Sequence, residues 1–152
     1  FKLLNENIRL NDATNVKPIK KAVSDKSGKR KFYTYRMSGW HSLIPDSQLK
    51  PESIANVDCI AIDSFLKDKK VDVIKIDVER AEHLVIAGMK QTLGRNKHLT
   101  MFCELPSIDP KLFIRNLERL GFDVKVIDEY NSNLRRVREN DFLVKTNLYC
   151  VK

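Results

Sequence analysis

Four acidic side chains follow two apolar segments of the chain and form its best-placed group for chemistry. They are Asp77, Glu79, Glu82 and Glu104. Ligands of open α/β sheets bind beyond the carboxyl ends of strands, so parallel strands at 71–77 and 99–105 would bring Asp77, Glu79 and Glu104 to one rim. Such carboxylates can orient a substrate hydroxyl or take its proton, and they can also bind Mg²⁺. The alternative is structural: a favourable interaction with a helix N-terminus, or a buried hydrogen bond.

The order of apolar and polar residues predicts the elements that must position these side chains. We expect a helix at 1–11, strands at 15–23, 29–36 and 54–62, a loop at 37–51, a helix at 64–69 capped by Asp63, a strand at 71–77, a helix at 81–93, a strand at 99–105, a helix from Asp109-Pro110 to Gly121, and strands at 122–127 and 142–151. This alternation predicts an α/β fold with a mostly parallel sheet, helices on both faces and an antiparallel pair at one end. We expect one domain over residues 1–152 with a β-insert at 29–62.

The composition is that of a globular chain with a basic surface. Of the 152 residues, 42% are hydrophobic and 32% charged, and the net charge is +8. No segment approaches the roughly 20 apolar residues of a membrane span. The three cysteines lack the spacing of a zinc site or a disulfide framework, which favours buried thiols in the cytoplasm. The basic clusters lack any nucleic-acid recognition motif, so we expect a solvated surface and no nucleic-acid partner.

Four segments in the same order resemble the FkbM family of S-adenosylmethionine-dependent methyltransferases. Ile74–Glu82 resembles its IKIDVEGAE signature, Ala22–Gly28 its AVSDKxG segment, Ser38–Leu43 its SGxHSL loop, and Cys103–Leu105 its IEL strand end. The clear departure is Arg80, which stands where the signature has glycine. A glycine there would allow positive φ or the close approach of a ligand. Arginine adds bulk and charge, which could bind an anionic group or alter activity.

The resemblance implies a Rossmann-like class I methyltransferase fold with strand order 3-2-1-4-5-7-6. In that frame the chain begins at the helix after strand 2, so strands 1 and 2 and the glycine-rich cofactor turn would be absent. The five glycines agree, since no two have the spacing GxG. We therefore expect the chain alone to fold poorly, to bind S-adenosyl-L-methionine weakly and to be inactive.

The resemblance also implies roles for individual residues. The catalytic candidates are Asp77, Glu79, Glu104 and His41. The cofactor candidates are Ala22, Val23, Ser24 and Asp25, together with Asp77, and the substrate candidates are Ser42, Arg80 and Glu82. The implied reaction is O-methylation of a hydroxyl on a sugar, a glycan or a polyketide-like small molecule, which needs no metal. Two alternatives stay open: a Mg²⁺-dependent phosphoryl-transfer or nuclease enzyme that uses the acidic rim, and a non-catalytic binding module.

Overall fold

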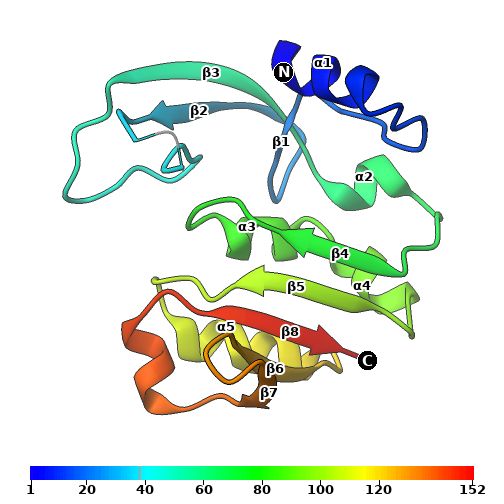
Figure 1. The fold of residues 1–152 in the computed structure, drawn as a ribbon, viewed down its shortest axis with the longest axis vertical. Coiled ribbons are helices and arrows are strands. Elements are labelled where there is room, and N and C mark those ends of the chain that lie inside the picture. The colour runs from blue at the N-terminus through cyan, green and yellow to red at the C-terminus, as the bar shows by residue number, and fades with distance from the viewer. Residues whose placement is uncertain (38) are drawn as a thin grey trace.

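The strands form two sheets in the part of the chain that the structure describes. The computed structural model describes residues 1–37 and 39–152. Figure 1 shows a three-stranded sheet at one end of the molecule and a five-stranded sheet at the other. Helices alternate with strands between them, so the expected α/β class is confirmed.

The three-stranded sheet contains the β-insert. Its order is β1 (Ala22–Val23), β3 (Ser53–Ile60) and β2 (Gly28–Thr34), with β1 parallel and β2 antiparallel to β3. The antiparallel pairing expected within residues 29–62 is confirmed, because β2 and β3 run antiparallel with Lys31 opposite Asn56. The strand expected at 15–23 covers only its last two residues. Pro18 explains part of this, because proline has no backbone N–H to donate to a neighbouring strand.

The five-stranded sheet carries the acidic residues. Its order is β4 (Val73–Ile76), β5 (Thr100–Glu104), β8 (Asn147–Val151), β6 (Asp123–Asp128) and β7 (Asn133–Arg136). The pair β4–β5 is parallel and the other three pairs are antiparallel. The expectation of a mostly parallel sheet is therefore wrong for the described residues. The β6–β7 hairpin was not expected, and short connections of this kind return a strand antiparallel to its neighbour.

The helices differ from expectation at three places. They are α1 (Lys2–Leu10), α2 (Ile62–Leu66), α3 (Glu82–Ala87), α4 (Lys90–Arg95) and α5 (Pro110–Arg119), with the 3₁₀-helix η1 (Glu139–Leu143) where a strand was expected to begin. The helix expected at 81–93 is broken at Gly88 and Met89. Asp63 lies inside α2 instead of capping it, and its carboxylate accepts from the backbone N–H groups of Gln91 and Thr92 at 3.0 and 2.7 Å. It thus caps the N-terminus of α4 from another helix.

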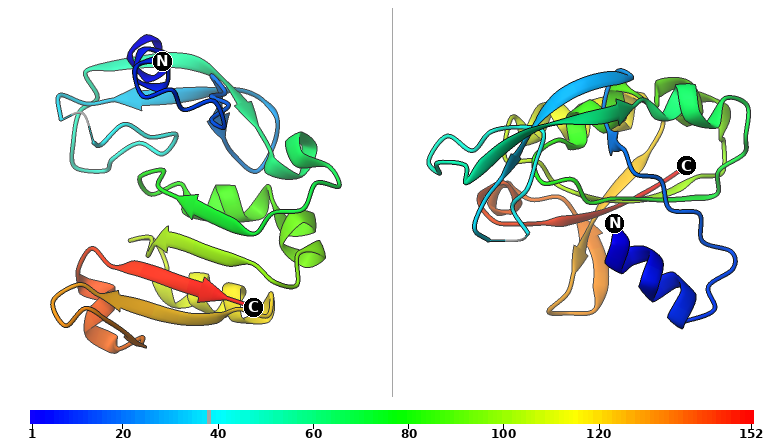
Figure 2. Two further views of the ribbon diagram at one scale, coloured as in Figure 1. Left: turned by 45° about the vertical axis from the view of Figure 1, so that its right-hand side comes forward. Right: turned by 90° about the horizontal axis from the view of Figure 1, so that it is seen from above.

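The core lies between the five-stranded sheet and helices α3 to α5. Its most buried members are Met89, Leu93, Leu99, Met101, Leu117, Leu148 and Cys150. The start expected for α5 is confirmed, since the Asp109 carboxylate accepts from Leu112 N–H at 3.2 Å and Pro110 follows it. Helix α1 has no buried residue and lies on the opposite side of the sheets from α5 (Figure 2). Within the described ranges, no helix has the length and apolar character needed to cross a membrane.

Candidate active site

The acidic residues meet at the carboxyl ends of β4 and β5. These strands are parallel neighbours with Ile76 opposite Cys103, so Asp77 and Glu104 end adjacent strands. One carboxylate oxygen each from Asp77, Glu79 and Glu104 lies within 4.8 Å of the others. The predicted convergence on one rim is confirmed, because two parallel strands place their ends at the same edge.

A cavity of about 420 Å³ lies beside this rim. The acidic part of its wall comes from Asp46, Glu79, Glu82, Glu104 and Asp141. The apolar part comes from Trp40, Leu105, Pro106, Phe142, Leu143 and Val144. A wall that combines an aromatic and aliphatic surface with a few convergent polar groups is typical of small-molecule sites.

Lys145 contributes a positive charge that the sequence did not reveal. Its ammonium group lies 3.2 Å from a Glu104 oxygen and 3.5 Å from a Glu79 oxygen. Asp77 pairs instead with Lys75 at 3.0 Å. The signal that could have found Lys145 is the polar triplet at 145–147, which interrupts the apolar segment expected as one strand at 142–151.

Glu82 and Glu104 are held in environments that disfavour their charged forms. Burial raises the pKa of Glu82, and the negative charges of Glu104 and Glu79 add to this effect against the opposing backbone N–H groups of Glu82 itself and Arg80. Burial also raises the pKa of Glu104, against the opposing hydrogen bond and charge of Lys145. A raised pKa brings a carboxylate closer to the range of an effective general base at neutral pH.

The turn that carries Glu79 and Arg80 has an unusual backbone. Both residues have positive φ, 48° and 71° respectively, which costs about 1 kcal/mol or more for a residue with a side chain. Ser42 stabilises this turn, because its buried hydroxyl donates to the Glu79 carbonyl at 2.5 Å. The same hydroxyl accepts a hydrogen bond from Ile44 N–H at 3.0 Å, so both hydrogen bonds of the Ser42 hydroxyl are made to the protein backbone. A substrate contact for Ser42 stays a prediction, and the geometry assigns it a positioning role.

Arg80 joins the acidic turn to the loop at 37–51. Its guanidinium pairs with Asp46 and donates to the Ile44 carbonyl at 3.1 Å, and it lies 6.0 Å from the centre of the Tyr35 ring. Asp46 in turn accepts from Gln48 N–H at 2.7 Å, which, with the Arg80 charge, lowers the Asp46 pKa despite partial burial. The charge of Arg80 is therefore directed at the loop. Binding of an anionic substrate group by Arg80 stays a prediction.

Replacing Arg80 with glycine should leave stability nearly unchanged and weaken substrate binding. The change relieves about 1 kcal/mol of backbone strain at the positive φ but removes the contacts with Asp46 and Ile44. The loop that bears Trp40 then loses an attachment, so we expect KM to rise about tenfold, equivalent to about 1.4 kcal/mol. Steady-state kinetics and thermal melting test this. The double variant Arg80→Gly/Asp46→Asn should be no worse than the single one, and unchanged kinetics in Arg80→Gly would remove Arg80 from substrate binding.

Comparisons with known proteins identify the family of this fold and site. A model of the methyltransferase FkbM domain matches residues 1–124. The chain belongs to the FkbM methyltransferase family. Its structure is similar to the crystal structure of methyltransferase FkbM from Methylobacillus flagellatus KT, with a TM-score of 0.56 and 16% sequence identity, a likeness of fold alone. The match covers 98% of this chain and 32% of that one, so this chain spans about a third of its length. A comparison with curated proteins finds no match.

Only some residues of the FkbM-like loop at 38–43 contribute to the acidic site. Its first residue, Ser38, lies outside the described residues. The His41 side chain contacts β2 and the residue that follows it. Its Nδ1 accepts from Tyr35 N–H at 3.1 Å, and its ring packs edge-on to Phe32. In the neutral ring this leaves the proton on Nε2. His41 is not among the described residues that line the cavity, and its catalytic role stays a prediction.

The predicted cofactor segment of this FkbM-family chain consists of β1 and the two residues after it. Ser24 is fully buried, and its hydroxyl donates to one Asp25 oxygen at 3.0 Å. Arg30 binds the same oxygen at 2.5 Å. Burial raises the Asp25 pKa, but the Ser24 hydrogen bond and the Arg30 charge outweigh it and the pKa is lowered. Asp25 is thus an anionic acceptor that could bind an amino group. A cofactor contact for residues 22–25 stays a prediction.

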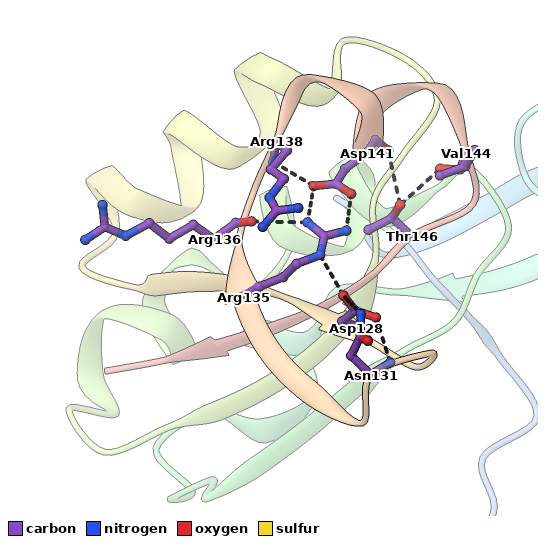
Figure 3. Close-up of polar contacts among 8 residues, drawn as sticks. All are labelled: Asp128, Asn131, Arg135, Arg136, Arg138, Asp141, Val144 and Thr146. Carbon is purple, nitrogen blue, oxygen red and sulfur yellow. Dashed lines mark hydrogen bonds and ion pairs between the residues drawn. The ribbon is translucent and has the colours of Figure 1, made fainter.

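A partly buried ion-pair network fixes the segment that carries Lys145. Figure 3 shows the Arg135 guanidinium binding both Asp141 oxygens, at 2.8 and 2.5 Å, and Asp128 at 3.1 Å. Asp141 also accepts from Arg138 N–H at 2.6 Å, and its carbonyl accepts from the Thr146 hydroxyl at 3.1 Å. The network therefore ties the β6–β7 hairpin to η1 and to the residues on both sides of Lys145.

Replacing Asp141 with asparagine should destabilise the protein at neutral pH. Asp141 is 4% exposed, and the change leaves a guanidinium without its bidentate partner, so we expect a loss of about 2–3 kcal/mol in the free energy of unfolding. The Asp141 pKa is lowered, chiefly by the hydrogen bond from Arg135. Burial opposes this shift, and the Arg138 N–H adds to it. Because the Asp141 pKa is lower in the folded state, its carboxylate stabilises the fold fully at pH values above its unfolded-state pKa of about 4. This stabilisation is lost as the pH falls through the folded-state pKa.

Denaturant unfolding at several pH values measures this difference. The gap between the original protein and Asp141→Asn should be full at pH 7 and shrink below about pH 4. Asp123→Asn is the matched control, because Asp123 is 61% exposed in its pair with Lys125 and should cost less than about 1 kcal/mol. Equal costs for the two variants would contradict the assigned role of the network.

Proposed function

We propose that the protein containing this chain transfers a methyl group from S-adenosyl-L-methionine to a hydroxyl of a sugar, a glycan or a polyketide-like small molecule. The observation that carries the proposal is the convergence of Asp77, Glu79 and Glu104 beside a cavity in a domain of the FkbM methyltransferase family. The cofactor would supply an electrophilic methyl group, which leaves the protein to orient the acceptor oxygen and to remove its proton.

The residues of the acidic rim and of the cavity wall divide this work between them. Asp77 and Glu104 end adjacent strands, so their carboxylates can hold one hydroxyl between them and accept its proton. The raised pKa of Glu104 supports a base role more than a purely structural one. Trp40, which lines the cavity and is 41% exposed, offers a flat surface for a sugar ring or an apolar acceptor.

We further propose that residues outside this chain supply the methionine-binding half of the cofactor site. The solved FkbM structure is about three times as long as this chain. Among the described residues, β4 pairs only with β5 and β1 only with β3, which leaves one edge of each strand for further strands. Val73 on β4 is 61% exposed, as expected of an apolar side chain that another segment covers. Asp25 would then hold the adenine end.

The other interpretations have less support. A Mg²⁺-dependent phosphoryl-transfer enzyme would use the same carboxylates, but these lie within the residues that match a methyltransferase domain. A non-catalytic module would not require carboxylates beside a cavity. We also propose a small-molecule or glycan partner instead of nucleic acid, and a cytoplasmic location, with which the three buried free thiols agree.

The full reading frame that encodes this chain provides the test. Incubation with labelled S-adenosylmethionine and a panel of sugars, oligosaccharides and polyketide-like alcohols should transfer label to at least one class of hydroxyl. The 152-residue chain alone should not melt cooperatively and should bind the cofactor more weakly than micromolar. Absence of both cofactor binding and transfer in the full protein would overturn the function. Cooperative melting with micromolar binding by the chain alone would overturn the proposed division of the site.

A further inference from the structure

We propose that the rim formed by Asp77, Glu79 and Glu104 binds a divalent cation, with the buried carboxylate of Glu82 completing the site from the cavity wall. The inference stands on the arrangement of these residues and does not depend on methyl transfer. It departs from the sequence-based expectation that the reaction needs no metal.

The spacing of the three carboxylates fits a common ion. Their nearest oxygen atoms all lie within 4.8 Å of one another. Two oxygen ligands of one ion can be separated by at most twice the metal–oxygen distance, which is roughly 4.6–5.2 Å for Ca²⁺ and about 4.0–4.2 Å for Mg²⁺. The oxygen separations at the rim are therefore within the range that one Ca²⁺ ion can span, and small side-chain rotations would bring the three carboxylates to the distances that Ca²⁺ or a smaller ion requires.

Glu82 gives independent evidence for a missing positive partner. Its residue is 1% exposed, and neither carboxylate oxygen has a hydrogen-bond partner of normal geometry among the described residues. A buried carboxylate without a well-formed hydrogen bond is destabilising, so proteins rarely keep one without a reason. Glu82 shares the cavity wall with Glu79 and Glu104. A cation at the rim, or a water bound to it, would satisfy this carboxylate.

Lys145 partly offsets the negative charge of the rim. Its ammonium bridges Glu79 and Glu104, while 64% of its side chain is exposed. A long, exposed side chain can turn away at little cost, so a divalent ion could displace it and supply more charge at the same place. Lys145 should therefore compete with the metal.

Titration of the full-length protein with Mn²⁺, followed by electron paramagnetic resonance without methyl donor or acceptor, tests the proposal. We expect one saturable site from which Ca²⁺ or Mg²⁺ displaces Mn²⁺. Glu104→Gln and Glu82→Gln should each weaken Mn²⁺ binding at least tenfold, whereas Glu118→Gln, an exposed position on α5, should not. Lys145→Met should tighten binding several-fold. Lys111→Met, which removes another lysine paired with a glutamate, should have no effect.

Each outcome decides the proposal separately from the proposed function. No saturable binding, or binding that the Glu82 and Glu104 variants leave unchanged, would overturn the cation site while methyl transfer could still be observed. Weaker binding in Lys145→Met would also overturn it, because the ammonium would then support the ion instead of competing with it. Tighter binding in that variant supports the site even in a protein that transfers no methyl group.

Discussion

Replacing Gly88 with alanine is expected to lower the free energy of unfolding by about 3 kcal/mol or more. A β-carbon at this position would overlap the carbonyl oxygen of Ser24 and lie 3.0 Å from the Cα of Asp25. Both neighbours belong to the backbone, so no side-chain rotation relieves the overlap. The break between α3 and α4 would have to move away from the end of β1. We therefore also expect weaker binding of any ligand held by the segment at 22–25.

Thermal and denaturant unfolding of the full-length protein measure this effect, and Gly94 provides a matched control. Gly94 lies in α4, six residues after Gly88, and a β-carbon there would meet nothing within 4 Å. Alanine at Gly94 should therefore be neutral or stabilising by up to about 1 kcal/mol, since it restricts the unfolded chain. A Gly88→Ala protein as stable as the Gly94→Ala protein would show that the break between α3 and α4 does not lie as close to the residues after β1 as the structure has it.

The sequence predicted the elements that depend on local signals. Asp109 and Pro110 start α5, and Gly121 follows its last turn, because capping chemistry acts over a few residues. The parallel ends of β4 and β5 followed from apolar segments and an intervening helix. The break at Gly88 has no local signal, because a single glycine is tolerated within a helix. Glycine is required here by the close approach of the Ser24 backbone, which lies 64 residues earlier in the chain.

The candidate site was predictable in part for the same reason. Asp77, Glu79 and Glu104 lie at strand ends that the pattern could locate. Lys145 was missed because its position depends on the network of Arg135 and Asp141, which joins segments that the sequence does not mark as neighbours. The family signature has glycine where this chain has Arg80, which predicted a positive φ at this position. The structure confirms it, with φ of 71°. The partner that accommodates arginine, Asp46, could not be anticipated.

These contacts place the acidic turn at the junction of the two sheets. Ser42 and Asp46 come from the loop of the β-insert, and they bind the Glu79 carbonyl and the Arg80 guanidinium. Gly88, at the other end of α3, contacts the residues after β1. The short helix α3 therefore connects the predicted acceptor side of the site with the predicted cofactor segment. A change in the packing of α3 should affect both sides together.

Replacing Asp77 with asparagine is expected to lower kcat/KM for methyl transfer by about 10²–10⁴-fold, the usual contribution of a positioned general base. Asparagine keeps the size and one acceptor oxygen but removes the charge, whether Asp77 acts on the hydroxyl directly or through a bound cation. The side chain is 57% exposed, so the melting temperature should hardly change. The effect should therefore appear in catalysis alone.

Asp72 is the matched control for this prediction. It lies just before β4 as Asp77 lies just after it, its side chain is 72% exposed, and it pairs with Lys70 at 3.0 Å as Asp77 pairs with Lys75 at 3.0 Å. Asp72→Asn removes the same charge from the opposite end of the same strand, away from the carboxyl-end rim. We expect it to retain full activity and stability. A similar, small loss in both variants would mean that Asp77 contributes only to the surface charge, and the base would then have to be sought in Glu104 or Glu79. A large loss confined to Asp77→Asn would locate the chemistry at the carboxyl end of β4.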